Sequence, residues 1–243
     1  EGQENIINLL RCAWAGSQKY GALVWSGDIK SSFPSMKNQV AAGLNMGIAG
    51  IPWWTTDIGG FFGANINDPE FHELLVRWFE YGCFCPVMRL HGYRWPLQPQ
   101  YGTTGGATCV SGAPNEVWSY TDQVCEILSD YLRLRERMLP YITELMEEAH
   151  EKGTPVMRPL FYDFPEDKES WNVETEYMFG PKVLVKPITD ADARETDVYL
   201  PGGASWTNAW TGETFEGGQK VHVAAPIEQI PLFTRDGYKL PMK

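Results

Sequence analysis

The sequence predicts a parallel α/β domain followed by an all-β sandwich. In the first part, apolar runs typical of buried strands alternate with runs whose apolar residues recur at helical spacing. After Gly153 the helical spacing disappears, and short strand-like runs alternate with Gly, Pro and Asp. We therefore expect one domain over residues 1–153 and a second over residues 154–243. Four of the strand-like runs in the first part are followed by a polar residue that could act on a ligand: Arg11, Asp28, Asp57 and His91.

The first part is expected to contain four strands joined by helices. Strands are predicted at 6–10, 21–25, 48–54 and 83–90. Apolar residues at four-residue steps predict a helix over 34–46, and Asp68 followed by Pro69 predicts the start of a second helix. A long helical pattern runs from about 119 to 150, with Pro140 as a kink and Gly153 as its stop. Because the carboxyl ends of parallel strands meet at one rim, the four polar residues are expected to gather there.

The second part is expected to be built of strands without a further helix. Its strand-like runs lie at 155–164, 177–187, 196–200 and 229–233, separated by turn residues. In the first part, a loop rich in Gly, Thr and Ser over 102–113 follows His91 and is expected to lie over the rim.

Composition argues against several classes of partner. The net charge of −11 and the pI of about 4.8 argue against nucleic acid and anionic membranes, because both select a basic face. No apolar run is long enough to span a bilayer. The five cysteines stand at spacings that match no metal motif, and Cys83 and Cys85 would share one face of a strand. Free thiols favour a reducing compartment, hence the cytoplasm, and no metal or other cofactor is expected.

Tryptophan stands beside both carboxylates at the predicted strand ends. Asp28 follows Trp25, and Asp57 follows Trp53 and Trp54. Indole faces cover the C–H faces of a sugar ring, and a carboxylate can bind sugar hydroxyls or protonate a glycosidic oxygen. The pattern therefore indicates a sugar pocket at the rim.

Several motifs resemble, in order, those of glycoside hydrolase family 31, which contains α-glucosidases, α-xylosidases and related retaining enzymes. They are RCAWAGSQKY at 11–20, WSGD at 25–28, WTTDIGGF at 54–61, RW at 77–78, RLHG at 89–92, LRERMLPY at 134–141, PVMRPL at 155–160 and WTGE at 210–213. The resemblance covers nearly the whole chain. It implies that the first part is the C-terminal half of a TIM-type (β/α)8 barrel and that the second is the β-sandwich that follows the barrel.

The resemblance implies a role for each rim residue. Asp28 corresponds to the general acid/base, and Arg11 to an arginine that contacts the sugar near it. His91 corresponds to a histidine that binds sugar hydroxyls, and Asp57 to a carboxylate that supports this arginine and histidine. The alternative is that Asp28, Asp57 and His91 are each structural, Asp28 for example as a turn or helix-cap residue. The aromatic walls of the pocket correspond to Trp25 and Phe61.

One catalytic part of the family is absent from the sequence. A retaining glycosidase needs a second carboxylate, which attacks the anomeric carbon. In the family this is an Asp in a Trp-x-Asp-x-Asn-Glu or Lys-x-Asp-x-Gly-Glu segment, and the sequence contains neither. We therefore expect the nucleophile, the N-terminal half of the barrel and any export signal upstream of Glu1, and we expect this chain alone to be inactive.

The expected substrate is an oligosaccharide or another α-glycoside. The segment 89–92 resembles the α-xylosidase branch, which favours hydrolysis of terminal non-reducing α-xylosyl residues. An α-glucosidase or a transglycosylase of the same family is the alternative, and a lyase would share the acid/base. A non-catalytic carbohydrate-binding fragment is the alternative from another class. The oligomeric state is left open.

Overall fold

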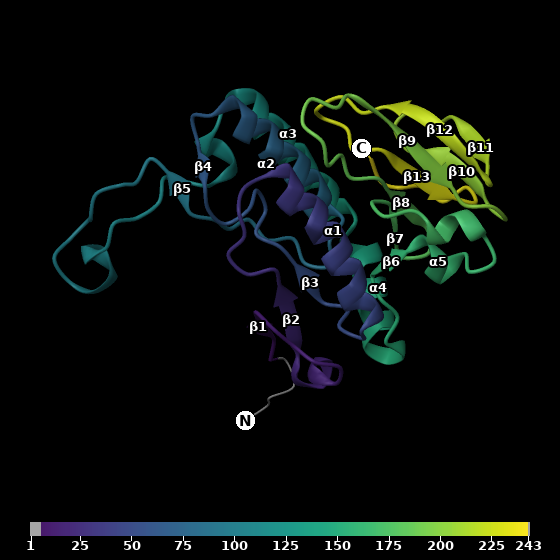
Figure 1. Ribbon diagram of the computed structural model, residues 1–243, viewed down its shortest axis with the longest axis horizontal. Helices are drawn as coiled ribbons and strands as arrows, with labels where there is room; N and C mark the ends of the chain where they lie inside the picture. The colour runs from purple at the N-terminus through teal and green to yellow at the C-terminus, as the bar shows by residue number, and fades with distance from the viewer. Residues whose placement is uncertain (1–5, 243) are drawn as a thin grey trace.

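The computed structural model describes residues 6–242 of the chain. A helical first part, with a small parallel sheet, lies beside a β-rich second part (Figure 1). The strands of the first part are β1 (Asn8–Leu10), β2 (Ala22–Trp25), β3 (Trp54–Thr55), β4 (Ala64–Asn65) and β5 (Arg94–Trp95). Its main helices are α1 (Phe33–Ile48), α2 (Pro69–Cys83), α3 (Asp122–Arg137) and α4 (Leu139–Lys152).

The first sheet is parallel, as predicted, and has the order β1-β2-β3. Helix α2 begins at the capping residue that the sequence predicted. The Asp68 side chain accepts a hydrogen bond from the backbone N–H of Glu70 at the start of α2, and Pro69 follows in the first turn. The Ser32 hydroxyl caps α1 in the same way through Ser35.

The long helical pattern forms two helices rather than one kinked helix. α3 ends at Arg137, α4 begins at Leu139, and Met138 lies between them. Pro140 stands in the first turn of α4, where its missing N–H removes no helical hydrogen bond. Gly153 stops α4 with a φ of 72°, in the left-handed region that glycine adopts freely.

Two of the predicted strands in the first part are wrong over most of their length. Helix α1 includes Ile48, residues 49–53 form no strand, and Trp54 alone of the range 48–54 belongs to a strand, β3. Helix α2 includes Cys83, and residues 84–90 form no strand, so Cys83 and Cys85 share no strand face. A short apolar run has the same composition whether it forms a strand, a helix end or a buried irregular segment.

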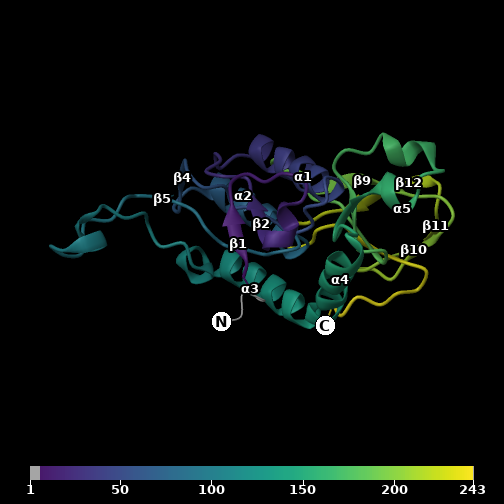
Figure 2. The same ribbon diagram turned by 90° about the horizontal axis from the view of Figure 1, so that it is seen from below.

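The loop after His91 was expected over the rim, but it extends away from the rest of the chain (Figure 2). Its internal hydrogen bonds join Gln98 to Ser111 and the backbone N–H of Tyr101 to the carbonyl of Ala107. Tyr101 is 76% exposed.

The second part is a sandwich of antiparallel strands. One sheet has the order β11-β10-β13-β8-β7-β6, and a separate pair is formed by β9 and β12. Met178, Leu184 and Phe233 of the larger sheet and Val198 and Leu200 of the pair belong to one buried cluster, so the two layers pack face to face. The strands are β6 (Met157–Pro159), β7 (Tyr177–Phe179), β8 (Val183–Val185), β9 (Glu195–Leu200), β10 (Ser205–Asn208), β11 (Thr214–Glu216), β12 (Gln219–Ala224) and β13 (Leu232–Arg235).

The second part differs from the sequence expectation in its details. The run 155–164 contains β6 followed by the short helix α5 (Leu160–Asp163), although no helix was expected there. The run 177–187 is a hairpin of β7 and β8 rather than one strand. Strands β10, β11 and β12 were not predicted.

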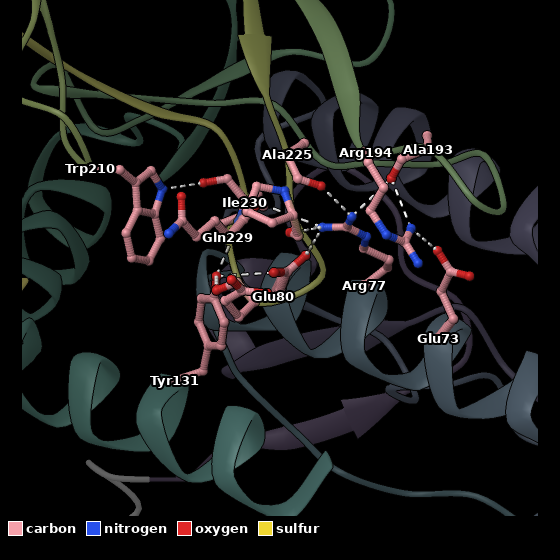
Figure 3. Close-up of polar contacts among 12 residues, drawn as sticks. Glu73, Arg77, Glu80, Tyr131, Ala193, Arg194, Trp210, Ala225, Gln229 and Ile230 are labelled. Carbon is pink, nitrogen blue, oxygen red and sulfur yellow. Dashed lines mark hydrogen bonds and ion pairs between the residues drawn. The ribbon is translucent and has the colours of Figure 1, made fainter. Parts of the chain in front are cut away.

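A buried polar network joins the two parts (Figure 3). Arg77 of α2 donates hydrogen bonds to the carboxylate of Glu80 at 3.1 Å and to the backbone carbonyls of Ala193, Ala225, Pro226 and Gln229. The hydroxyl of Tyr131 in α3 lies 3.1 Å from the Glu80 carboxylate and accepts from the backbone N–H of Ile230. One apolar core also includes residues of α2, α3, β7 and β13. The domain boundary near residue 153 therefore stays a prediction, because packing is continuous between the two parts.

No helix in the described range 6–242 is long and apolar enough to cross a membrane.

Candidate functional site

The candidate site lies at the carboxyl ends of the three parallel strands. Arg11 directly follows β1, Asp28 stands three residues after β2, and Asp57 stands two residues after β3. Because the strands are paired in parallel, these ends face the same edge of the sheet. This is the arrangement that the sequence predicted for the first three polar residues.

Arg11 and Asp28 form an ion pair at this edge. The Arg11 Nη2 atom lies 2.8 Å from the Asp28 Oδ2 atom, and the two side chains are 61% and 39% exposed. The guanidinium carbon of Arg11 lies 5.4 Å from the centroid of the Trp25 ring. The Asp28 carboxylate is thus held by an arginine that itself lies over an indole, and it is still accessible to a ligand.

Asp57 is fully buried and pairs with Arg89. Burial raises the pKa of Asp57, and the Asp28 charge acts in the same direction, while Arg89 and His91 oppose the shift. Its Oδ2 atom has no hydrogen-bond partner among the described residues. The guanidinium carbon of Arg89 lies 5.9 Å from the Trp25 ring centroid, so this indole has both arginines as neighbours.

Asp57 was expected to support Arg11, but its arginine partner is a different one. The Asp57 carboxylate bonds Arg89, whereas Arg11 bonds Asp28. Arg89 lies in the RLHG motif, and the sequence alone assigns it no role of its own. A cation inside an otherwise apolar run requires a buried partner, and this requirement could have drawn attention to it.

A tight turn brings Phe61 to the Asp28 side of the site. Gly60 has a φ of 74°, and a Cβ atom there would lie 2.6 Å from the Cα atom of Ser31. The turn therefore requires glycine, and it lets the backbone N–H of Phe61 donate to the carbonyl of Ile29 at 2.7 Å. The Phe61 ring then lies beside the His91 ring, with 5.6 Å between their centroids.

The structure thus groups Arg11, Asp28 and Trp25, and it places Phe61 beside His91. The charges of Asp28 and His91 both act on the pKa of Asp57. Chemically, this edge offers an accessible carboxylate and two guanidinium groups, while the second carboxylate, that of Asp57, is buried against Arg89. The catalytic and binding roles of these residues stay predictions. Within residues 6–242, no group of three or more His, Cys, Asp or Glu side chains is placed to hold a metal ion.

Comparisons with known proteins match both parts of the chain. The model of the glycosyl hydrolases family 31 TIM-barrel domain matches residues 1–145, and that of the glycosyl hydrolase family 31 C-terminal domain matches residues 153–240. An alpha-xylosidase of Saccharolobus solfataricus is 39% identical over 100% of this chain and 31% of its own length. An alpha-glucosidase 2 of Bacillus thermoamyloliquefaciens is 34% identical over 98% of this chain and 28% of its own.

A solved structure agrees with these matches. The crystal structure of an alpha-xylosidase from a soil metagenome, complexed with xylose, superposes with a TM-score of 0.94 at 55% identity. It covers 98% of this chain, which in turn covers 36% of that protein. The chain therefore spans about a third of the length of the relatives that it matches.

Proposed function

Because the chain belongs to glycosyl hydrolase family 31, we propose that it is the C-terminal portion of a retaining exo-α-glycosidase that removes terminal α-xylosyl residues from oligosaccharides without a cofactor. Asp28 acts as the general acid/base. Arg11, Trp25, Asp57, Phe61 and His91 form the part of the sugar pocket that this chain supplies.

The observation that carries the proposal is the Arg11–Asp28 pair beside Trp25 at the strand ends. The indole offers an apolar face to the sugar ring, while the arginine offers donors to its hydroxyls. The Asp28 carboxyl is accessible enough to reach the oxygen between two sugars. Such a group can protonate the leaving oxygen and later take a proton from the attacking water.

The second carboxylate of the reaction must come from outside this sequence. In a retaining mechanism it attacks the anomeric carbon from a position about 5–5.5 Å from the acid/base, and it forms a covalent glycosyl-enzyme. The sequence lacks the family's nucleophile segment, and within residues 6–242 the first sheet has three strands rather than a closed barrel. We infer that a preceding part of the same protein supplies the nucleophile and the other barrel strands.

The preference for xylose rests on similarity. The Saccharolobus relative and the metagenomic structure are both alpha-xylosidases, and the latter contains xylose. The Bacillus relative, an alpha-glucosidase, keeps glucose as the second candidate. Hydrolysis of an oligosaccharide requires the same acid/base in either case.

The decisive assay uses the complete protein with aryl α-xyloside and aryl α-glucoside as substrates. We expect the xyloside to have the higher kcat/KM and the first-formed sugar to be the α-anomer, as retention requires. A first-formed β-anomer, or no turnover of either substrate, contradicts the proposal. Product analysis with an added acceptor sugar separates a hydrolase from a transglycosylase. A stable monomer of this chain that binds sugar in a sedimentation experiment would support a binding function instead.

A further inference from the structure

The chain between α2 and His91 is held in place by side chains rather than by strand pairing. Four successive backbone carbonyls, those of residues 83 to 86, accept side-chain hydrogen bonds. Arg135 of α3 donates to three of them, those of Cys83, Cys85 and Pro86, at 2.7, 2.7 and 2.8 Å. The hydroxyl of Tyr177 in β7 donates to the fourth, that of Phe84, at 2.9 Å.

Arg135 suits this task because of its shape and its charge. Its planar guanidinium group presents several donors in a fixed geometry, so one side chain can bind three carbonyls at once. A cation is also favourable at the C-terminus of a helix, and α2 ends at Cys83. Burial lowers the pKa of Arg135. Within residues 6–242 Arg135 forms no ion pair, and backbone carbonyls take the place of a carboxylate.

The segment fixed by Arg135 leads directly into the candidate site. The backbone N–H of Val87 donates to the carbonyl of Trp54 at 3.1 Å, next to the end of β3. Two residues later Arg89 pairs with Asp57, and its carbonyl accepts from the backbone N–H of Ile58 at 3.4 Å. His91 follows and lies beside Phe61. A displacement at residues 83–86 would therefore be passed to Arg89 and His91.

We propose that Arg135 is a positioning residue for the sugar site: by binding the carbonyls of Cys83, Cys85 and Pro86, it holds Arg89 and His91 in register with Asp57 and Phe61. The proposal rests on the function proposed above. Arg135 itself touches no residue assigned to the pocket. Its effect on the reaction is transmitted by the backbone of residues 83–91.

Arg137, two positions along the same helix, is a matched control. It also donates to two backbone carbonyls, those of Pro241 and Met242, each at 2.8 Å. These carbonyls belong to a segment that carries no candidate site residue. The variants R135M and R137M thus each remove a guanidinium from backbone carbonyls, but only the first affects the chain that leads to His91.

The experiment compares R135M, R135K and R137M in the complete enzyme, well below their unfolding temperatures. We expect R135M to lower kcat/KM on the aryl α-xyloside by about 10- to 100-fold, because an active-site misplacement of about 1 Å can cost 10² in rate. The inhibition constant of xylose should be higher for R135M than for the wild type. R135K keeps the positive charge but loses the planar guanidinium donors, and we expect it to lower kcat/KM by roughly 3- to 10-fold. R137M should stay within about twofold of the wild type.

Amide hydrogen exchange gives a readout that is independent of activity. The amide hydrogens of Val87 and Ile58 should exchange faster in R135M and R135K than in R137M, because these amides form hydrogen bonds between the affected segment and its neighbours. If R135M does not fold, R135K decides. Unchanged kinetics and exchange in the folded Arg135 variants would overturn the proposal. If the wild type cleaves neither aryl glycoside, the proposed function fails, while the exchange rates still decide whether Arg135 fixes the segment.

Discussion

Two arginine–carboxylate pairs in this chain have similar geometry and opposite surroundings. The Arg11–Asp28 pair is 2.8 Å long at the strand ends, with side chains 61% and 39% exposed. The Arg77–Glu80 pair is 3.1 Å long between the two parts of the molecule, and both side chains are fully buried. Water screens the first pair, so it contributes little to stability, but its carboxylate can meet a ligand. The second pair can meet no ligand.

Burial changes the chemical character of the second pair. It raises the pKa of Glu80 to about 8, against the opposing effect of Arg77, so Glu80 is mostly protonated at neutral pH. The charge of Arg77 is then held mainly by the four backbone carbonyls around it. The comparison shows that an arginine–carboxyl contact can present a reactive group where water reaches it, and that the same contact stabilises the fold where water is excluded.

The largest expected effect tests the exposed pair. In the complete enzyme, D28N should lower kcat/KM on substrates with poor leaving groups by about 10²- to 10⁴-fold, the usual contribution of general acid–base catalysis. The loss should be much smaller on activated aryl glycosides, which need little protonation. D130N is the matched control, because Asp130 is also an exposed partner of an arginine. Equal losses of D28N on both substrate types would contradict the acid/base role.

The next effect tests the buried pair. R77M should lower the free energy of unfolding by more than about 3 kcal/mol, because it leaves several buried carbonyls without a donor. Urea unfolding measures the loss. The activity of the molecules that remain folded should change far less than in D28N. A stability within about 1 kcal/mol of the wild type would show that this network does not hold the two parts together.

A pH titration sharpens the comparison further. The pKa of Glu80 is about 8 in the folded chain and near its ordinary value of 4.5 in the unfolded chain, so the folded state binds more protons between these pH values. Its contribution to stability is complete below about pH 4.5 and is lost as pH rises through 8, by an amount on the order of a few kcal/mol.

The variant E80Q isolates this contribution, because the amide cannot ionise. Its unfolding free energy should depend less steeply on pH between 5 and about 8.5 than that of the wild type. Subtracting the two curves removes other titrating groups, such as His222, whose pKa is raised by Asp197 and Glu195. Parallel curves would mean that Glu80 does not titrate in this range.

The smallest effect belongs to a third pair, Arg133–Asp130, whose side chains are 64% and 67% exposed. R133M should change the free energy of unfolding by no more than about 0.5 kcal/mol, as is typical of an exposed pair three residues apart on a helix. Activity should be unchanged. A loss as large as that of R77M would remove burial as the explanation for the difference between the pairs.

Much of the architecture could be predicted from local patterns. The parallel first sheet, the β-rich second part and helix α1 follow from periodicity, and the start of α2 follows from its capping residue. The family resemblance is confirmed by both domain models. The strand predicted over 83–90 is wrong because an apolar run whose carbonyls bond the Arg135 side chain looks the same in sequence as a run that pairs in a sheet. Strand β12 was missed because four of its six residues are exposed, which weakens the apolar signal.

By itself, the sequence determined which side chains stand at the ends of the parallel strands, because chain order and alternation of strand and helix place Arg11, Asp28 and Asp57 there. Only the tertiary structure decided how those groups pair. Asp57 bonds Arg89 rather than Arg11, and Arg77 bonds loops more than a hundred residues away. Pairing depends on distance and burial in three dimensions, and local sequence patterns carry neither.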